Sequence, residues 1–191
     1  MTGADAHCDR RELLGRGVGA GVAVAAISLL LGVRNAFAES DTDGTLLQKA
    51  ITLERTAVLA YDDILDRDLL SARAARTARV LRGHEQEHVK VLETALTDLG
   101  GTLPAEPRSA DFAGAGTELA DVRDEAGALA YLIALELAQV AAYHDAQSKL
   151  VEARLLQTTA SIMGAEGQHL VVLRAAAGRP LVPDAIETGS G

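Results

Sequence analysis

Residues 83–89 read Gly-His-Glu-Gln-Glu-His-Val and lie inside a long segment whose apolar residues recur at helical spacing. Glu85 and His88 form a Glu-x-x-His pair within this stretch. Residues three apart are neighbours on one face of a helix, so the carboxylate and the imidazole can bind one metal ion or two adjacent ions. A single pair of this kind also occurs on ordinary helix surfaces, so its meaning depends on the rest of the chain.

The pair occurs twice in the chain, because Glu166 and His169 repeat it 81 residues later with apolar residues in the same register. A glutamate followed seven residues later by a tyrosine precedes each copy by about 30 residues. Such self-similarity indicates a tandem duplication. The matching positions are Glu54, Tyr61, Glu85 and His88 in the first unit and Glu136, Tyr143, Glu166 and His169 in the second.

These two units resemble the ferritin-like di-iron carboxylate family, and in particular its bacterioferritin and rubrerythrin branches. The resemblance covers about residues 44–177. It implies an all-α ferritin-like four-helix bundle with one long crossover between helices 2 and 3, and with the ligands pointing into the core. It also implies specific roles for the six ligands: terminal for Glu54 and Glu136, bridging for Glu85 and Glu166, and one nitrogen for each ion from His88 and His169.

Two departures from the family limit the expected cofactors. Bacterioferritin holds haem with a Met beside its first Glu-x-x-His pair, but Gln86 and Gly167 stand at the corresponding places, so no haem is expected. Rubrerythrin has a Cys-rich iron domain. The single Cys of this chain, at position 8, predicts that this domain is absent.

The charge of the four glutamates independently indicates metal. All four fall on helix stripes that should face the core, where an ionised carboxylate costs several kcal/mol unless it is paired. Arg55 and Arg82 flank other faces of their helices, and no Lys or Arg lies on the stripes of the second unit. Two divalent ions would supply the missing charge. Mixed carboxylate and imidazole ligands suit two iron ions or, alternatively, two manganese ions better than a structural zinc.

Three classes of function remain open for such a site. The first is a di-iron oxidoreductase that oxidises Fe(II) with oxygen or hydrogen peroxide, as a ferroxidase or peroxide scavenger. The second is peroxide dismutation like that of manganese catalases, whose ligand plan is similar. The third is a non-catalytic bundle that buffers metal or protects against stress.

Residues around the ligands divide into two groups. His84 and His144 are expected to lie off the ligand face, the alternative being a role in supporting the ligands or in metal entry. Each tyrosine lies seven residues, or about 10.5 Å along the helix, from the glutamate of its own unit. Because neighbouring helices run antiparallel, at least one of the two hydroxyls is expected to donate to a ligand carboxylate of the other unit and to fix its orientation. The alternative is a pair of core aromatics whose hydroxyls reach the surface.

Composition and periodicity outline one helical domain at residues 39–191. The 191 residues are 48% hydrophobic and only 3% aromatic, which is typical of an aliphatic helix bundle. The net charge of −9, without a basic stripe, argues against nucleic acid as a partner. Without a clear fifth amphipathic helix a large cage is not expected, whereas a homodimer is compatible with the sequence. The predicted helices are at about 45–66, 72–99, 120–150 and 154–177, followed by a loosely held tail.

Residues 1–38 predict a Tat-type signal peptide. Arg10 and Arg11 precede an almost wholly apolar run at 17–33, and Ala-Phe-Ala at 36–38 offers a cleavage site. The protein is therefore expected to pass through the Tat translocase to the periplasm or the extracellular space. An uncleaved membrane anchor is the alternative.

Overall fold

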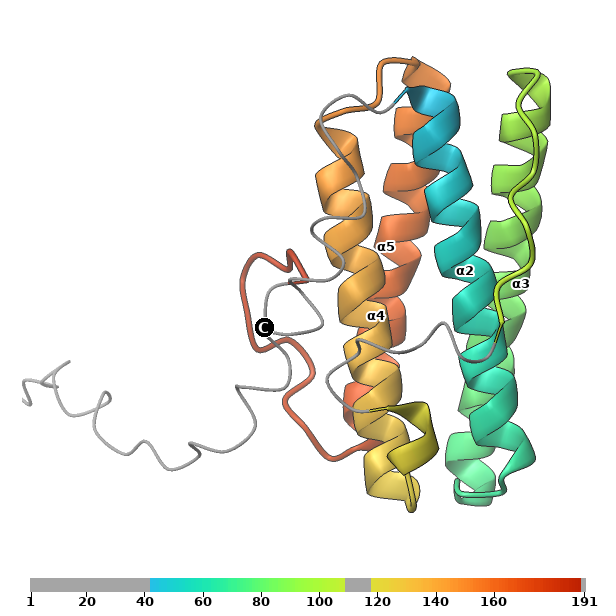
Figure 1. Cartoon of the computed structure of the whole chain (residues 1–191). Helices are drawn as coiled ribbons and strands as arrows, with labels where there is room; N and C mark the ends of the chain where they lie inside the picture. Colours follow the sequence, from blue (N-terminus) through green and yellow to red (C-terminus); the bar gives the residue numbers. More distant parts are fainter. Residues whose placement is uncertain (1–41, 109–117, 190–191) are drawn as a thin grey trace, which may run out of the picture.

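The computed structural model describes residues 42–108 and 118–189, and the described chain forms four long helices and no strand (Figure 1). The predicted all-α bundle is thereby confirmed. The predicted signal peptide lies outside the described residues. The helices are α2 (Asp43–Asp66), α3 (Ala72–Asp98), α4 (Glu125–Gln147) and α5 (Ala153–Ala176), with a short 3-10 turn, η3 (Leu119–Asp121), before α4.

Local side chains account for the helix ends. The side chain of the residue before each helix accepts a hydrogen bond from a backbone N–H of the first turn, which is the usual N-cap. Gly100 and Gly178, at φ 74° and 65°, follow the ends of α3 and α5 in the left-handed conformation that terminates many helices. The N-caps are Thr42, Ser71, Asp124 and Glu152.

The turn between α4 and α5 is longer than predicted. We expected the third helix to reach residue 150, but α4 ends at Gln147. In the turn, the backbone N–H groups of Val151 and Glu152 donate to the carboxylate of Asp43 at 3.0 and 2.9 Å. The first residue of α2 therefore holds the turn in a non-helical conformation.

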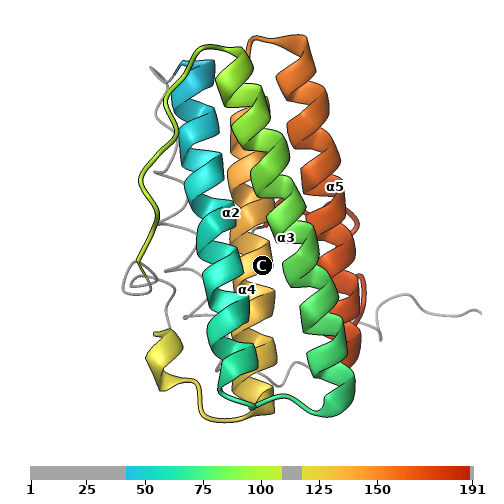
Figure 2. The ribbon, with the colours of Figure 1, turned by 90° about the vertical axis from the view of Figure 1, so that its right-hand side faces the viewer.

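A long connection carries the chain from one end of the bundle to the other between α3 and α4. These two helices therefore run parallel, whereas α2 and α3, and likewise α4 and α5, are antiparallel pairs (Figures 1 and 2). The described start of the connection lies along α2. There Gln48 donates to the Thr102 carbonyl at 2.6 Å, and Arg55 donates to the Pro104 carbonyl at 2.9 Å.

Helix α4 is the most deeply buried element of the described bundle. Among the described helices it alone is long and apolar enough to cross a membrane, and 72% of its apolar window is buried inside the protein. Two clusters of buried apolar side chains fill the core, one around Leu132 and one around Leu92. Buried polar side chains of all four helices are part of the same interior.

The C-terminal segment packs more closely than predicted. Arg174 of α5 forms an ion pair with Glu187 at 2.9 Å. Gly189, at φ 71°, approaches α4 so closely that a Cβ there would overlap the Leu137 carbonyl oxygen and the Ala141 nitrogen. Residues 187–189 are thus docked on the bundle rather than loosely held, whereas residues 181–186 are exposed.

Candidate metal centre

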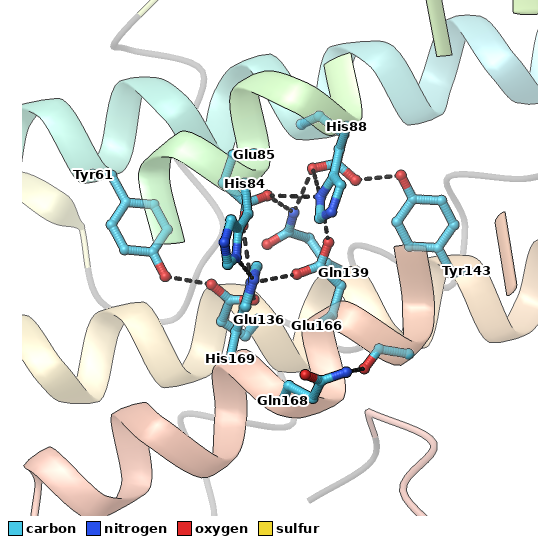
Figure 3. Close-up of polar contacts among 12 residues, drawn as sticks. Tyr61, His84, Glu85, His88, Glu136, Gln139, Tyr143, Glu166, Gln168 and His169 are labelled. Atoms are coloured by element: carbon cyan, nitrogen blue, oxygen red, sulfur yellow. Dashed lines mark hydrogen bonds and ion pairs between the residues drawn. The ribbon is translucent and has the colours of Figure 1, made fainter. Parts of the chain in front are cut away.

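The duplicated Glu and His residues meet inside the bundle (Figure 3). Each helix contributes one glutamate, and α3 and α5 each add the histidine that follows one turn later. All four glutamate side chains have no exposed surface. The structure therefore brings together all six residues that the sequence predicts as ligands: Glu54, Glu85, His88, Glu136, Glu166 and His169.

The six residues form two overlapping groups, each with ligand atoms within 4.8 Å of one another. Both groups contain Glu85 and Glu166. We call the group completed by Glu54 and His88 the His88 position, and the group completed by Glu136 and His169 the His169 position. A pair of adjacent ions needs carboxylates that bridge both ions and carboxylates that bind one ion only. The two shared and the two unshared glutamates match these two kinds of ligand.

Close contacts define each position. His88 Nδ1 lies 3.0 Å from Glu166 Oε1 and 3.6 Å from Glu54 Oε2. His169 Nδ1 lies 2.8 Å from Glu166 Oε2 and 3.1 Å from both Glu85 Oε1 and Glu136 Oε2. His88 Nδ1 also lies 3.7 Å from Glu85 Oε2, so each imidazole directs one nitrogen at three carboxylate oxygens.

Several buried atoms of the centre lack hydrogen-bond partners among the described residues. Buried polar groups are normally paired, so such atoms require an explanation. Here they are donor atoms of the types that bind iron or manganese, and they converge from different helices. The residues present therefore fit a pair of metal ions. The unpaired ligand atoms are Glu85 Oε1, His88 Nδ1, Glu166 Oε1 and Glu166 Oε2.

Nearby Arg residues do not neutralise the centre. Arg55 pairs with Glu93 at 2.7 Å, and Arg82 donates to Asp62 at 2.9 Å. Within the described chain, the ion pairs of the four glutamates are with the two histidines. The positive charge of the centre must therefore come from protons or from metal.

Burial and mutual repulsion shift the protonation of the centre. Burial, with the charge of Glu85 added, raises the pKa of Glu54 well above its ordinary value, and burial is also the main cause of the raised pKa of Glu136. Although burial opposes it, hydrogen bonding to the carboxylates raises the pKa of His88 and of His169 to about 12. The centre thus retains protons at neutral pH when it lacks ions.

Each tyrosine contacts the unshared glutamate of the other unit. Tyr61 donates to Glu136 Oε1 and Tyr143 donates to Glu54 Oε1. Both rings are buried, and burial together with these carboxylates raises the pKa of each phenol well above its ordinary value. The tyrosines therefore stay protonated, and their hydroxyls can orient the two glutamates, as hydrogen-bond donors to metal-ligating carboxylates do.

Two further residues beside the ligands were not predicted from the sequence. Gln139 is fully buried and donates from Nε2 to Glu54 Oε2 and Glu85 Oε2, at 2.9 Å each. His84, which we expected off the ligand face, places Nδ1 2.9 Å from His169 Nε2. The feature of the sequence that could have identified Gln139 is its position three residues after Glu136, on the same helix face.

A surface pocket of about 320 Å³ adjoins the His169 position. It lies between α3 and α5, and its lining includes His84, Gln168 and His169. The His169 side chain is only 3% exposed, and the exposed His84 stacks on it with ring centroids 5.1 Å apart (Figure 3). This pocket therefore reaches the candidate ligand His169 from the surface of the described bundle.

Comparison with known proteins extends the structural result. A family model described as a ferritin-like domain matches residues 42–179. The matched range contains all six candidate ligands and both tyrosines. Searches of curated proteins and of solved structures returned no match.

Proposed function

Because the chain belongs to the ferritin-like family, we propose that its buried centre binds two Fe(II) ions and oxidises them with oxygen or hydrogen peroxide. The observation that carries this proposal is the pair of four-residue ligand groups that share Glu85 and Glu166. Glu85 and Glu166 would hold two Fe(II) ions next to each other, and the pair could then supply the two electrons that one oxidant molecule takes up. With hydrogen peroxide, two Fe(II) become two Fe(III), and two protons complete the conversion of the O–O bond to two waters.

The protein contributes binding, orientation and proton storage to this reaction. The terminal glutamates are oriented by Tyr61 and Tyr143. The protons held by the histidines and the unshared glutamates leave when ions bind, because metal ligands must be deprotonated. Apolar side chains around the centre limit access of water. The pocket at His84 offers a route for iron and for a small oxidant.

Manganese-dependent dismutation of peroxide is the second candidate function. The observation that favours it is the donor set itself, since carboxylates and imidazoles also suit manganese. Dismutation differs from iron oxidation in its products, because it releases oxygen from peroxide without consuming reduced metal. One set of measurements therefore separates the two candidates.

The test is an anaerobic titration of the metal-stripped chain with Fe(II), followed by a pulse of oxygen or peroxide. We expect two Fe(II) per chain and oxidant consumption in proportion to iron. Glu85→Ala and His169→Ala should lower both values while the bundle stays helical, and the exposed His144→Ala serves as the control. Oxygen release from the manganese-loaded protein would support dismutation, and binding without either reaction would indicate metal buffering.

We further propose that the protein is exported by the Tat pathway, so that it folds and acquires metal before it crosses the membrane. The support is the Arg10-Arg11 pair followed by an apolar run and a small-residue cleavage site. Arg10→Lys combined with Arg11→Lys should retain the protein inside the cell. Unchanged export of this double variant would contradict the proposal.

A further inference from the structure

We propose that Gln139 and His84 make the two metal positions unequal, so that the ion at the His169 position is held more tightly than the ion at the His88 position. This inference rests on the proposed dinuclear centre and concerns how that centre fills. It begins from the internal repeat, because two identical units would provide two equivalent positions. Each of the two residues breaks that equivalence next to the ligands.

The repeat shows where the symmetry is broken. Gln139 follows Glu136 by three residues, and the same place after Glu54 holds Ala57. His84 immediately precedes the first Glu-x-x-His pair, and the corresponding residue of the second unit is Ala165. In both cases one unit has a polar side chain with hydrogen-bonding groups, and the other unit has only a methyl group.

Gln139 acts on the His88 position. Its amide donates two hydrogen bonds of 2.9 Å, one to Glu54 Oε2 and one to Glu85 Oε2. Both oxygens belong to residues of that position, and donated hydrogen bonds draw electron density from the oxygens that must bind the ion. An entering ion has to compete with the amide for them. At Ala57 the His169 position has no equivalent donor.

His84 acts on the His169 position. His169 directs Nδ1 at the carboxylates and places Nε2 2.9 Å from His84 Nδ1. When Nδ1 binds an ion, the neutral ring carries its proton on Nε2, which can then donate to His84 Nδ1. A partner on the second nitrogen fixes the orientation of a ligating imidazole and makes it a stronger donor to metal. Among the described residues, His88 has no such partner, and the repeat places only Ala165 opposite.

The other contacts of the ligands are balanced between the two positions. Tyr143 donates to the unshared glutamate of the His88 position, and Tyr61 donates to that of the His169 position. Glu85 and Glu166 belong to both. The Gln139 amide weakens the His88 position and the His84 imidazole strengthens the His169 position. Both differences therefore favour filling of the His169 position first. The loss of an outer partner such as His84 typically lowers metal affinity by about 10- to 100-fold.

The experiment is a titration of the metal-stripped full chain with Co(II), followed by calorimetry and by the visible absorption of the bound ion. We expect two binding steps whose affinities differ by about tenfold or more. His169→Ala should remove the tighter step and His88→Ala the weaker one, which assigns each step to its position. No enzymatic activity is needed for these measurements.

Variants that restore the repeat test the cause. Gln139→Ala should strengthen the weaker step, and His84→Ala should weaken the tighter step by about tenfold. The two substitutions together should bring the steps close to equality. Gln168→Ala is the matched control for His84→Ala, because Gln168 is exposed and lines the same pocket. Circular dichroism of each variant verifies that the bundle is intact.

Two equal steps in the unmodified protein would overturn the inference. So would a weaker step that loses affinity in Gln139→Ala, because the amide oxygen would then be acting as a ligand. If the steps are equal but Fe(II) is still oxidised, only the unequal positions are wrong and the proposed function stands. If neither Co(II) nor Fe(II) binds, both proposals fail.

Discussion

Metal binding to the stripped protein should expel protons, and the structure predicts how many. The perturbation is the addition of two divalent ions per chain at pH 8. Each ion needs a neutral imidazole and ionised carboxylates as ligands. At this pH His88 and His169, whose pKa is raised to about 12, both still carry a proton that must leave.

The unshared glutamates add to this number. The pKa of Glu54 and of Glu136 is raised well above the ordinary value, chiefly by burial. Together with the histidines they set a range of about two to four protons released for each pair of ions. By linkage, the apparent affinity for the pair should rise about 10²- to 10⁴-fold per pH unit around neutrality.

Calorimetry in two buffers with different ionisation enthalpies measures the number directly, because released protons are taken up by the buffer. Glu54→Gln should lower the number by up to one, since the amide cannot release a carboxyl proton. His144→Gln is the control, because His144 is exposed on α4 and away from the ligands. Release of less than one proton per pair of ions at pH 8 would refute the assignment of protons to this centre.

Three further predictions follow from the same contacts. The stripped protein should lose unfolding free energy in urea titrations as the pH rises from 7 to 9, because the stabilisation contributed by the two protonated site histidines is fully present below about pH 6.5 and declines from there until the pH reaches their raised pKa of about 12; stability that rises over this interval would contradict buried protonated groups. Tyr61→Phe combined with Tyr143→Phe should keep the metal content but change the rate of Fe(II) oxidation, and an unchanged rate would mean that both rings serve only packing. Gly189→Ala should destabilise the protein by about 1 kcal/mol or more and expose the C-terminal segment to limited proteolysis, since its φ of 71° and its contact with α4 disfavour a Cβ.

Element boundaries show where local sequence information is sufficient and where it is not. The observed α3 and α5 begin and end within one residue of the predicted 72–99 and 154–177, because a capping side chain and a glycine mark the ends locally. The end of α4 was predicted three residues too late. Its turn is held by Asp43, more than 100 residues away in sequence, and no local pattern reveals that contact.

The docking of residues 187–189 on the bundle and the contact between His84 and His169 were not predicted, for a related reason. A polar residue beside a ligand, or a short segment after the last helix, has no periodic pattern that marks it as buried or bonded. The position of Gly189 depends on a gap on the surface of α4, and the role of His84 depends on how closely α5 approaches α3. Both depend on helix packing rather than on local preference.

The sequence by itself determined the bundle and the donor groups that lie in its core. A duplicated Glu-x-x-His pair needs only the three-residue spacing of one helix to point its carboxylate and imidazole the same way, so this information is local. The tertiary structure decided which oxygens face which nitrogen, and which unit Tyr61 and Gln139 serve. These contacts join residues tens of positions apart on different helices, and small changes in crossing angle and rotation decide which side chains meet.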